Sequence, residues 1–362
     1  MTESLPIVDH VNRALTEVFA EHRPDLVALS ADLAPLVDQL EAFSSGGKRT
    51  RAQFVAAGAQ LAVTEPEAGT DEALAHAGVA VELFHAAALI HDDLLDRSDT
   101  RRGRPATHRV FEALHRERGW TGDREHFGVS AAILAGDLLL MWSNDALDRA
   151  RALVGRDRAE VAAAEFRRMR TEVTAGQYLD VVEELAWPVI PVEDWADRAV
   201  AIATAKSARY SVESPLRLGA SFAGASVAEL DAASAIGLPL GLAFQLRDDV
   251  LGVFGDPEVT GKPAGDDLRE GKRTLRVAEV SARGDDATRQ LFAERLGQPD
   301  LTGAEIERLQ SALVDSGALD AVEARIQAWL DQAVAAIDAT DLPAQARASF
   351  TTLAERTAKR SA

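Results

Sequence analysis

The sequence predicts an all-α protein that forms one domain over residues 1–362. Apolar residues, mostly alanine and leucine, recur at spacings of three and four, the period of a helix with one buried face. No segment alternates apolar and polar residues as a half-buried strand does, and WPVIPV is too short to seed a sheet. Length alone suggests about two domains, but without a repeat or a low-complexity linker one large helical domain is favoured.

The longest helical pattern covers residues 73–96 and ends before the turn SDTRRGRP. The same periodicity predicts further helices over residues 8–20, 49–63, 129–152, 158–183, 193–208, 228–254, 304–316, 318–338 and 343–358. Segments rich in glycine, proline and acidic residues separate them, at residues 64–72, 101–105, 187–191, 255–265 and 297–303.

Composition excludes several classes of protein. The net charge of −19 argues against a general nucleic-acid binder and against broad adhesion to anionic membranes. The absence of cysteine excludes disulfides, thiolate catalysis and cysteine zinc sites. The longest uncharged stretch, residues 232–246, is shorter than a membrane span, and the first residues show no export signal. We therefore expect a soluble cytoplasmic protein without stable membrane insertion.

The motif HDDLLD carries the strongest chemical signal, with Asp92, Asp93 and Asp96. On a helix Asp92 and Asp96 share one face, where like charges repel, and the C-terminal end of the helix dipole disfavours anions further. An oxygen-only set of this kind, after an apolar helix, favours a hard cation such as Mg²⁺. The alternative is an acidic helix end that Arg97 and Arg101 neutralise.

A second acidic pair, Asp248 and Asp249 in FQLRDDVLGVFGD, also follows an apolar helix. If the two helices faced each other, carboxylates would line both sides of one cavity. Basic residues follow both motifs, namely Arg101, Arg102, Arg104 and Lys262. Carboxylates, Mg²⁺ and basic side chains together suit a diphosphate, whereas a surface salt-bridge network would not explain the apolar approach to both motifs.

Lysine is rare, and its positions are unusual. Only five of the 39 basic residues are lysine, a compact charge suited to phosphate oxygens. They are Lys48, Lys206, Lys262, Lys272 and Lys359. These positions suggest that the lysines bind phosphate groups, and the alternative is that their placement is due to chance.

The chain resembles the trans-isoprenyl diphosphate synthases, the polyprenyl synthetase family. The motifs that carry this resemblance follow one another in the family's order: GGKRTR, ELFHAAALIHDDLLD, RRGRPATH, AGDLLL, AGQYLD, AKS, FQLRDD and GKPAGDDLREGKRT, over residues 46–274. The resemblance implies a helical bundle around a central cavity, a homodimer, three Mg²⁺ ions per active site and the substrates isopentenyl diphosphate and an allylic diphosphate.

The resemblance also implies a role for individual residues. Asp92 and Asp96 would bind two Mg²⁺ ions with Asp93 supporting, and Asp248 would bind the third, with Asp249 near it and near the substrate. The allylic diphosphate would be held by Arg101, Lys206 and Lys262. Isopentenyl diphosphate would be held by Lys48, Arg51, His85 and Arg102. Gln177 and Gln245 would line the cavity near the reacting carbons. For His85 the alternative is a satisfied core histidine, and Lys272 belongs to the closing GKRT segment.

The second acidic motif departs from the family pattern. The family's usual DDxxD reads DDVLG here, with Gly252 at the third acidic position. Asp256, one turn further on, is a partial substitute. We expect the first metal ligand and the activity to survive, with weaker binding of the third Mg²⁺.

The implied reaction is head-to-tail condensation, and the helix before Asp92 would set product length. One helical turn rises about 5.4 Å, comparable to one extended isoprene unit. Ala88 and Ala87 are small, and Phe84 is the next large side chain, which predicts a cavity floor there and a C20 product, geranylgeranyl diphosphate. Farnesyl diphosphate (C15) or products of C25 and longer are the alternatives, as is Phe84 acting as ordinary core packing.

Three other functions stay open on the sequence alone. A terpene cyclase shares the first acidic motif but needs no isopentenyl diphosphate site, and NDALDRARA lacks its usual Ser and Glu positions. A phosphohydrolase that uses His91 and Asp92 would leave the second acidic pair unexplained. A non-catalytic partner subunit is disfavoured by the intact Asp92 and Asp96.

Overall fold

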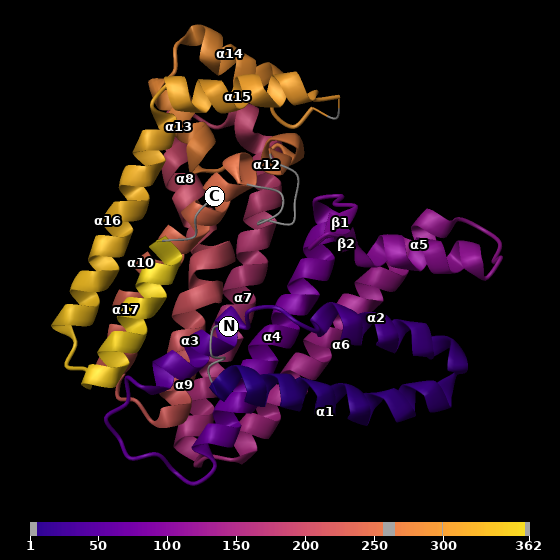
Figure 1. Cartoon of the computed structure of the whole chain (residues 1–362), viewed down its shortest axis with the longest axis vertical. Helices are drawn as coiled ribbons and strands as arrows, with labels where there is room; N and C mark the ends of the chain where they lie inside the picture. The colour runs from indigo at the N-terminus through magenta and orange to yellow at the C-terminus, as the bar shows by residue number, and fades with distance from the viewer. Residues whose placement is uncertain (1–5, 256–264, 299, 359–362) are drawn as a thin grey trace. The chain divides into compact units, whose positions relative to one another are not determined.

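The structure, a computed structural model, describes residues 6–255, 265–298 and 300–358 and is helical nearly throughout (Figure 1). The predicted all-α class is confirmed. In the described ranges the strands are two-residue segments, β1 (Thr100–Arg101) and β2 (Arg104–Pro105), which pair antiparallel. Residue contacts divide the chain into two units that interleave in sequence, and each is described by itself. The single domain stays a prediction.

The first unit comprises Met1–Glu165 and Pro215–Leu230. Its helices are α1 (Pro6–Leu29), η1 (Ala31–Leu33), α2 (Ala34–Ser44), α3 (Thr50–Ala59), α4 (Thr70–Leu95), α5 (Thr107–Glu117), α6 (Arg124–Ala152), the start of α7 (Arg156–Ala186), most of α9 (Ser214–Ala223) and the start of α10 (Val227–Phe254).

Helix α4 is the buried centre of the first unit, packed against α1, α3 and α6. Val79, Leu83 and Ile90 are fully buried. A helix that is apolar nearly all round buries several faces instead of one stripe. The core therefore fixes α4, and its last turn carries Asp92 and Asp96 out of that core.

The second unit comprises Phe166–Ser214 and Asp231–Ala362. It contains the rest of α7 and α10, together with η2 (Trp187–Val189), η3 (Val192–Asp194), α8 (Trp195–Ala203), the π-helix η4 (Thr204–Glu213), α12 (Asp266–Glu270), α13 (Leu275–Arg283), α14 (Asp286–Arg295), α15 (Gly303–Asp315), α16 (Ala318–Ala339) and α17 (Ala344–Ala358).

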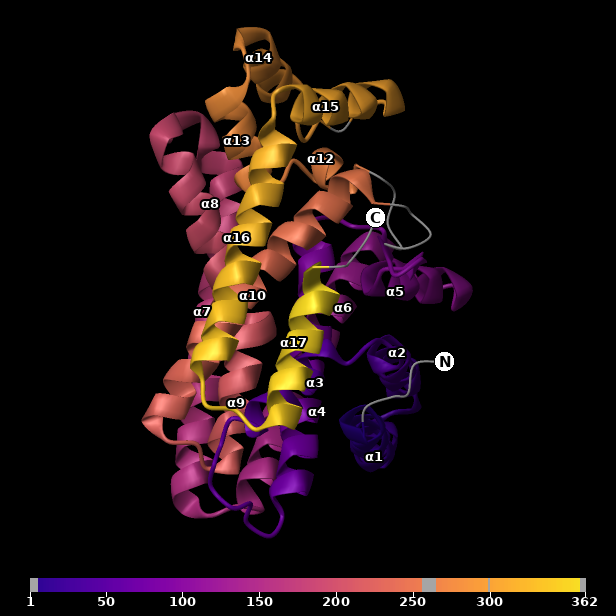
Figure 2. The same ribbon diagram turned by 60° about the vertical axis from the view of Figure 1, so that its left-hand side comes forward.

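In the second unit α16 packs against α13, α15 and α17, and the two C-terminal helices run side by side in both views (Figures 1 and 2). One hydrophobic cluster joins the end of α10 to the helices that follow it. Val253 of α10 is buried there with Leu268 of α12 and Val277 of α13. This packing fixes α12 beside the last turns of α10, where the second acidic pair lies.

The predicted bounds agree with the structure within three residues for α4, α7, α10, α15, α16 and α17. The predicted helix over 8–20 is too short, because α1 extends to Leu29, and the one over 129–152 begins five residues after the start of α6. The expected helix over 193–208 is interrupted, because α8 ends at Ala203 and the backbone continues as the π-helix. Helices α2, α5, α9, α12, α13 and α14 were not predicted. They are 5 to 11 residues long, so each provides too few turns for a clear period.

Three helices, α4, α6 and α10, are long and apolar enough to cross a membrane by length and composition. The apolar window of α4 is 78% buried within the protein, whereas that of α6 is 39% buried. The apolar character of α4 is thus explained by core packing. The expectation of no membrane insertion stays a prediction.

Candidate active site

The three aspartates of the first motif, at the end of α4, differ in burial. Asp96 caps the helix, and its backbone N–H donates to the carbonyl oxygen of Asp92. The side chain of Asp93 is 1% exposed, whereas Asp92 and Asp96 are half-buried. Asp92 and Asp96 are one turn apart and share a face of α4. Two carboxylates of the motif therefore remain accessible, and the third lies in the interior.

Arg101 neutralises the interior aspartate. Its Nε donates to Asp93 Oδ1 at 2.7 Å, its Nη2 contacts the same oxygen, and Nη2 lies 3.7 Å from Asp92 Oδ2. Burial opposes the charge of Arg101, but the carboxylates of Asp93, Asp92 and Asp96 raise its pKa above the ordinary value. The guanidinium therefore stays charged and links β1 to the end of α4.

The tight turn between β1 and β2 presents two arginines on the same hairpin. Its central residues, Arg102 and Gly103, both have positive φ, at 54° and 72°. Two central residues of this kind form a type I′ turn, which matches the twist of paired strands. The left-handed conformation is uncommon for arginine and costs free energy, which pairing of the strands must offset.

A cluster of cations surrounds His85, which lies two helical turns before Asp92 on the same face of α4. Burial, followed by the charges of Arg51 and Arg102, holds the pKa of His85 well below its usual range, so the imidazole is neutral. Burial also lowers the pKa of Arg49 and of Arg102. Excess positive charge beside a neutral imidazole is an environment that favours an anion.

One member of this cluster is held by a carboxylate. Arg49, which has φ of 50°, lies with its Nη1 3.7 Å from Glu82 Oε2, and both side chains are 7% exposed. A small pocket beside them is lined by Glu82, His85, Leu89 and Arg102, among others. Lys48 is exposed just before Arg49. The structure thus brings Lys48, His85 and Arg102 to the same region of the first unit.

In the second unit, Lys206 and Gln177 lie where α7 meets the π-helix. Lys206 Nζ lies 2.5 Å from Asp180 Oδ2. A Cβ added at Gly176 would come within 2.5 Å of the backbone nitrogen of Lys206, so only glycine permits this approach. Gln177 and Asp180 are three residues apart and share a face of α7. π-Helical turns often lie at functional sites.

Asp249 lies in the interior next to the more accessible Asp248. Gln245 Nε2 donates to Asp249 Oδ1 at 2.7 Å. Burial raises the pKa of Asp249 to about 7, with Asp267 and Asp248 adding to the shift and Arg276 opposing it. As in the first motif, one carboxylate is buried and the other is half-buried.

Of the residues singled out in and just before the GKPAGDDLREGKRT segment, the structure describes only Lys272. Lys262 and Asp256 lie outside the described residues. Lys272 Nζ lies 2.7 Å from Glu270 Oε2.

The donor set suits Mg²⁺. Among the described residues no three histidine, aspartate or glutamate side chains lie close enough to complete a metal site. Mg²⁺ is, however, commonly held by one or two carboxylates together with water and substrate phosphates. Asp92 and Asp96 in the first unit, and Asp248 in the second, each offer oxygen donors of this kind, so the residues present fit the implied ion.

The residues expected to set product length differ in burial. Phe84 is 5% exposed and Ala87 is fully buried, whereas Ala88 is half-buried. Phe84, Ala88 and Asp92 follow one another at intervals of four and form a line along α4. Ala87 lies off this line, so Ala88 is the better placed of the two alanines to face a substrate chain that starts at Asp92.

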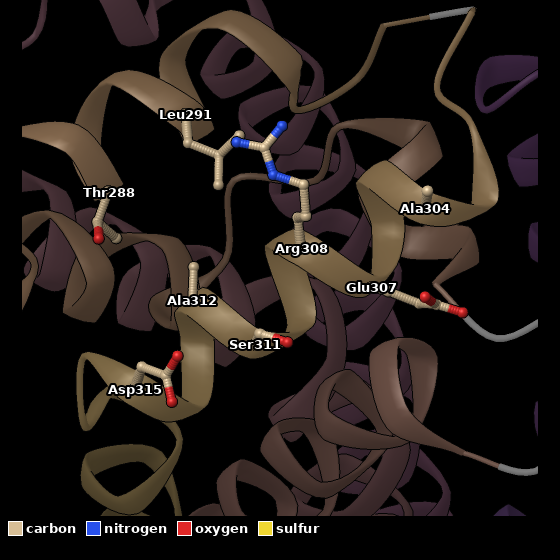
Figure 3. Close-up of a pocket in the computed structure, with 8 residues that line it drawn as sticks. All are labelled: Thr288, Leu291, Ala304, Glu307, Arg308, Ser311, Ala312 and Asp315. Carbon is tan, nitrogen blue, oxygen red and sulfur yellow. The ribbon is translucent and has the colours of Figure 1, made fainter.

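A surface hollow lies elsewhere in the second unit. It measures about 400 Å³ and is lined by residues of α14 and α15 (Figure 3). Arg308 extends from α15 toward Leu291 of α14, with Glu307 and Asp315 at either side (Figure 3). None of its lining residues is a predicted site residue.

Sequence reasoning missed Asp180, which holds the predicted Lys206. It also missed two ion pairs near predicted residues, Glu82 with Arg49 and Arg276 with Asp267. Asp180 was within reach of the sequence, since it lies three residues after Gln177 in the AGQYLD motif. The others are paired by packing between helices, for which the sequence contains no local signal.

Comparison with known proteins places this geometry in context. The profile of the family described as polyprenyl synthetase matches residues 36–313. A geranylfarnesyl diphosphate synthase of Aeropyrum pernix is 33% identical over 81% of this chain and 84% of its own. A geranylgeranyl diphosphate synthase of Mycobacterium tuberculosis is 33% identical over 84% of this chain and 80% of its own. A geranylgeranyl pyrophosphate synthase of Corynebacterium glutamicum, solved with isoprenyl diphosphate and magnesium, is 37% identical over 98% and 99% of the two chains, with a TM-score of 0.90.

Proposed function

The chain belongs to the polyprenyl synthetase family and is a chain-elongating trans-prenyltransferase, and we propose that it condenses isopentenyl diphosphate with an allylic diphosphate to give geranylgeranyl diphosphate. The observation that carries this proposal is that one helix carries two accessible carboxylates, Asp92 and Asp96, and also the neutral His85 with a cluster of arginines around it. Carboxylates suit Mg²⁺, and the arginines suit a diphosphate.

We assign the allylic diphosphate to the acidic motifs. Asp92, Asp96 and Asp248 would hold three Mg²⁺ ions, which when bound neutralise the diphosphate and help it to leave. Lys206 and Arg101 would contact the same group, and Lys262 belongs to this set by sequence. The bond between the allylic carbon and the diphosphate oxygen breaks, the double bond of isopentenyl diphosphate forms the new carbon–carbon bond, and a proton leaves to the released diphosphate. The site would have to exclude water, which would otherwise react with the allylic carbocation that forms when the diphosphate leaves.

We assign isopentenyl diphosphate to the arginine cluster. Arg51, Arg102 and Lys48 would bind its diphosphate as charged donors, and the neutral His85 would donate a hydrogen bond. Arg51 and His85 are half-buried, which strengthens their interactions with an anion because charges in a low dielectric are screened less. Gln177 and Gln245 would line the cavity, and Asp249, held by Gln245, would stabilise that wall.

We propose a C20 product because the line from Asp92 to Phe84 has one small residue, Ala88, between them. The relatives from Aeropyrum pernix and Mycobacterium tuberculosis make different products by name, geranylfarnesyl and geranylgeranyl diphosphate. Family membership thus leaves product length open, and the proposal depends on whether Phe84 forms the floor. A floor elsewhere gives C15 or C25.

We propose a homodimer in which the exposed face of α6 meets a second copy. Ile133, Leu134 and Met141 are 45%, 60% and 55% exposed. Leu134 and Met141 are two turns apart and lie on one face. Burying such a face against its own copy removes apolar surface from water. We also propose that the protein is cytoplasmic and does not insert into a membrane.

One assay tests the proposed reaction. The purified chain is incubated with Mg²⁺, labelled isopentenyl diphosphate and either dimethylallyl or farnesyl diphosphate, and the products are separated by chain length. We expect labelled C20 product and its loss in Asp92→Asn, with Asp286→Asn on exposed α14 as the matched control. Product formed without isopentenyl diphosphate would indicate a cyclase. Phosphate released without a new carbon–carbon bond would indicate a phosphohydrolase, and inactivity of the chain alone would indicate a partner subunit.

A further inference from the structure

We infer that helix α1 is part of the proposed isopentenyl diphosphate site, with Asn12 as a positioning residue. Helix α1 ends at Leu29, ahead of residues 46–274, which carry the family motifs. It nevertheless contacts the first of those motifs, GGKRTR, because Arg49 Nε donates to Asn12 Oδ1 at 2.8 Å. Arg49 is 7% exposed, so we assign it no contact with substrate. Its effect on the site has to act through the residues on either side of it.

Arg49 has a backbone conformation that its surroundings must maintain. Its φ of 50° is left-handed, which is uncommon for a residue other than glycine and persists only where contacts hold it. Three elements hold the guanidinium: Nε donates to Asn12 of α1, Nη2 donates to the carbonyl oxygen of Ser44 at 2.8 Å, and Nη1 lies 3.7 Å from Glu82 Oε2 of α4. Glu82 Oε1 also accepts from the backbone nitrogen of Ala52, in the first turn of α3, at 3.3 Å. The guanidinium therefore ties the start of α3 to α1, α2 and α4.

The turn at Arg49 determines where the neighbouring cations lie. Lys48 precedes it and is exposed, and Arg51 lies two residues later in the first turn of α3. A Cβ added at Gly47 would lie 3.7 Å from Arg102 Nη1, so the same loop runs beside the hairpin that carries Arg102. A rotation of the backbone at Arg49 would therefore move Lys48 and Arg51 relative to Arg102. These three cations are the ones assigned to the diphosphate of isopentenyl diphosphate.

Asn12 suits this role because it accepts a hydrogen bond without adding a charge. Burial lowers the pKa of Arg49 below its ordinary value, the carboxylate of Glu82 opposes this shift, and the charge of Arg102 adds to it. One carboxylate thus faces several cations. The neutral amide of Asn12 holds Arg49 and leaves the cluster with the positive charge that favours an anion.

The inference rests on the proposed function, because the substrate contacts of Lys48, Arg51 and Arg102 belong to that proposal. It predicts a loss that is confined to one of the two substrates. Asn12→Leu keeps the approximate size of the side chain and favours the helix, but it leaves Arg49 Nε without its acceptor. A hydrogen bond to a charged group corresponds to about tenfold or more in an equilibrium constant. We therefore expect KM for isopentenyl diphosphate to rise about tenfold, while KM for the allylic diphosphate stays unchanged.

Steady-state kinetics with each substrate varied in turn, at saturating Mg²⁺, test the inference. Asn12→Asp is the conservative variant, because it keeps the acceptor at the same reach on an exposed position of α1. Solvent screens its added charge, so KM for isopentenyl diphosphate should stay within about threefold of the wild-type value. Arg13→Leu, at the next exposed position of α1, is the matched control and should leave both KM values unchanged.

The two KM values separate positioning from general stability. KM reports only the folded enzyme, so a purely structural loss lowers the melting temperature and the active fraction and leaves both KM values unchanged. The inference is overturned by a wild-type KM for isopentenyl diphosphate in Asn12→Leu, by an equal rise in both KM values, or by a rise in Asn12→Asp as large as in Asn12→Leu. If Asn12→Leu does not fold, Asn12→Ala is judged by the same criteria. If the wild-type chain forms no prenyl product from the two substrates, the proposed function fails instead.

Discussion

A phenylalanine at position 88 is expected to shorten the product by one isoprene unit. Phe84, Ala88 and Asp92 form a line along α4, and the growing chain is proposed to run along it from Asp92. Four residues of helix span about 6 Å, roughly one extended isoprene unit. In Ala88→Phe the floor moves from Phe84 to position 88, so the product should change from C20 to C15.

The opposite change at the floor should lengthen the product. Phe84→Ala removes a side chain that is 5% exposed. Such a truncation costs about 3–5 kcal/mol of stability, so the variant must first be shown to fold by circular dichroism. In the folded variant we expect products of C25 and longer, because the next turn of α4 becomes available to the chain.

The measurement is the chain length of labelled products, separated by reversed-phase chromatography, with dimethylallyl diphosphate as primer. Both variants are compared with the wild-type chain at equal Mg²⁺ and equal extents of reaction. The reasoning fails if Ala88→Phe retains the wild-type product length at appreciable activity. It also fails if folded Phe84→Ala makes the same product as the wild type, since Phe84 would then be ordinary core packing.

Three further results are expected. Glu82→Gln leaves the buried Arg49 without its counter-charge and should lower the free energy of unfolding by about 3–5 kcal/mol in urea titrations; a loss below about 1 kcal/mol would contradict this. Asp180→Asn releases Lys206, and because ordering a free lysine costs about 1–2 kcal/mol, KM for the allylic diphosphate should rise about tenfold while KM for isopentenyl diphosphate stays constant. Burial and nearby arginines lower the pKa of His85 in the folded chain. The unfolded chain therefore takes up a proton that the folded chain does not, and the free energy of unfolding should fall by up to about 1.4 kcal/mol per pH unit below about pH 6.5. His85→Gln should remove that contribution, as measured by urea titrations at about pH 8 and about pH 5.5.

The sequence predicts α4 well because its apolar pattern is long and ends at a clear turn. The predicted helix over 73–96 corresponds to Thr70–Leu95, and the aspartates lie on its last turn as expected. The sequence could not rank the three aspartates of the motif. Asp93 is the buried one because the hairpin places Arg101 against it, and that contact depends on packing of two segments that share no local pattern.

The π-helix illustrates a different limit of sequence reasoning. The pattern over 193–208 predicts one regular helix, and Lys206 lies within it. A π-helix differs from an α-helix by a slightly wider turn, and over ten residues the apolar spacing does not distinguish the two. Within this π-helix the backbone of Lys206 lies close to that of Gly176 in α7, an approach that only glycine permits. Tertiary contact thus decides how the lysine is presented.

The two acidic motifs also differ in how their geometry is maintained. The spacing between Asp92 and Asp96 is set by the rise of a single helix and survives as long as α4 is helical. Asp248 and Asp267 come from different elements, so their approach requires α12 to stay packed on α10 through Leu268 and Val253. Asp267 can lie this close to α10 because Gly252 has no side chain, and Arg276 offsets part of the negative charge of Asp267. The geometry around the second motif therefore depends on the core that joins α10 to α12, whereas that of the first motif depends on one helix.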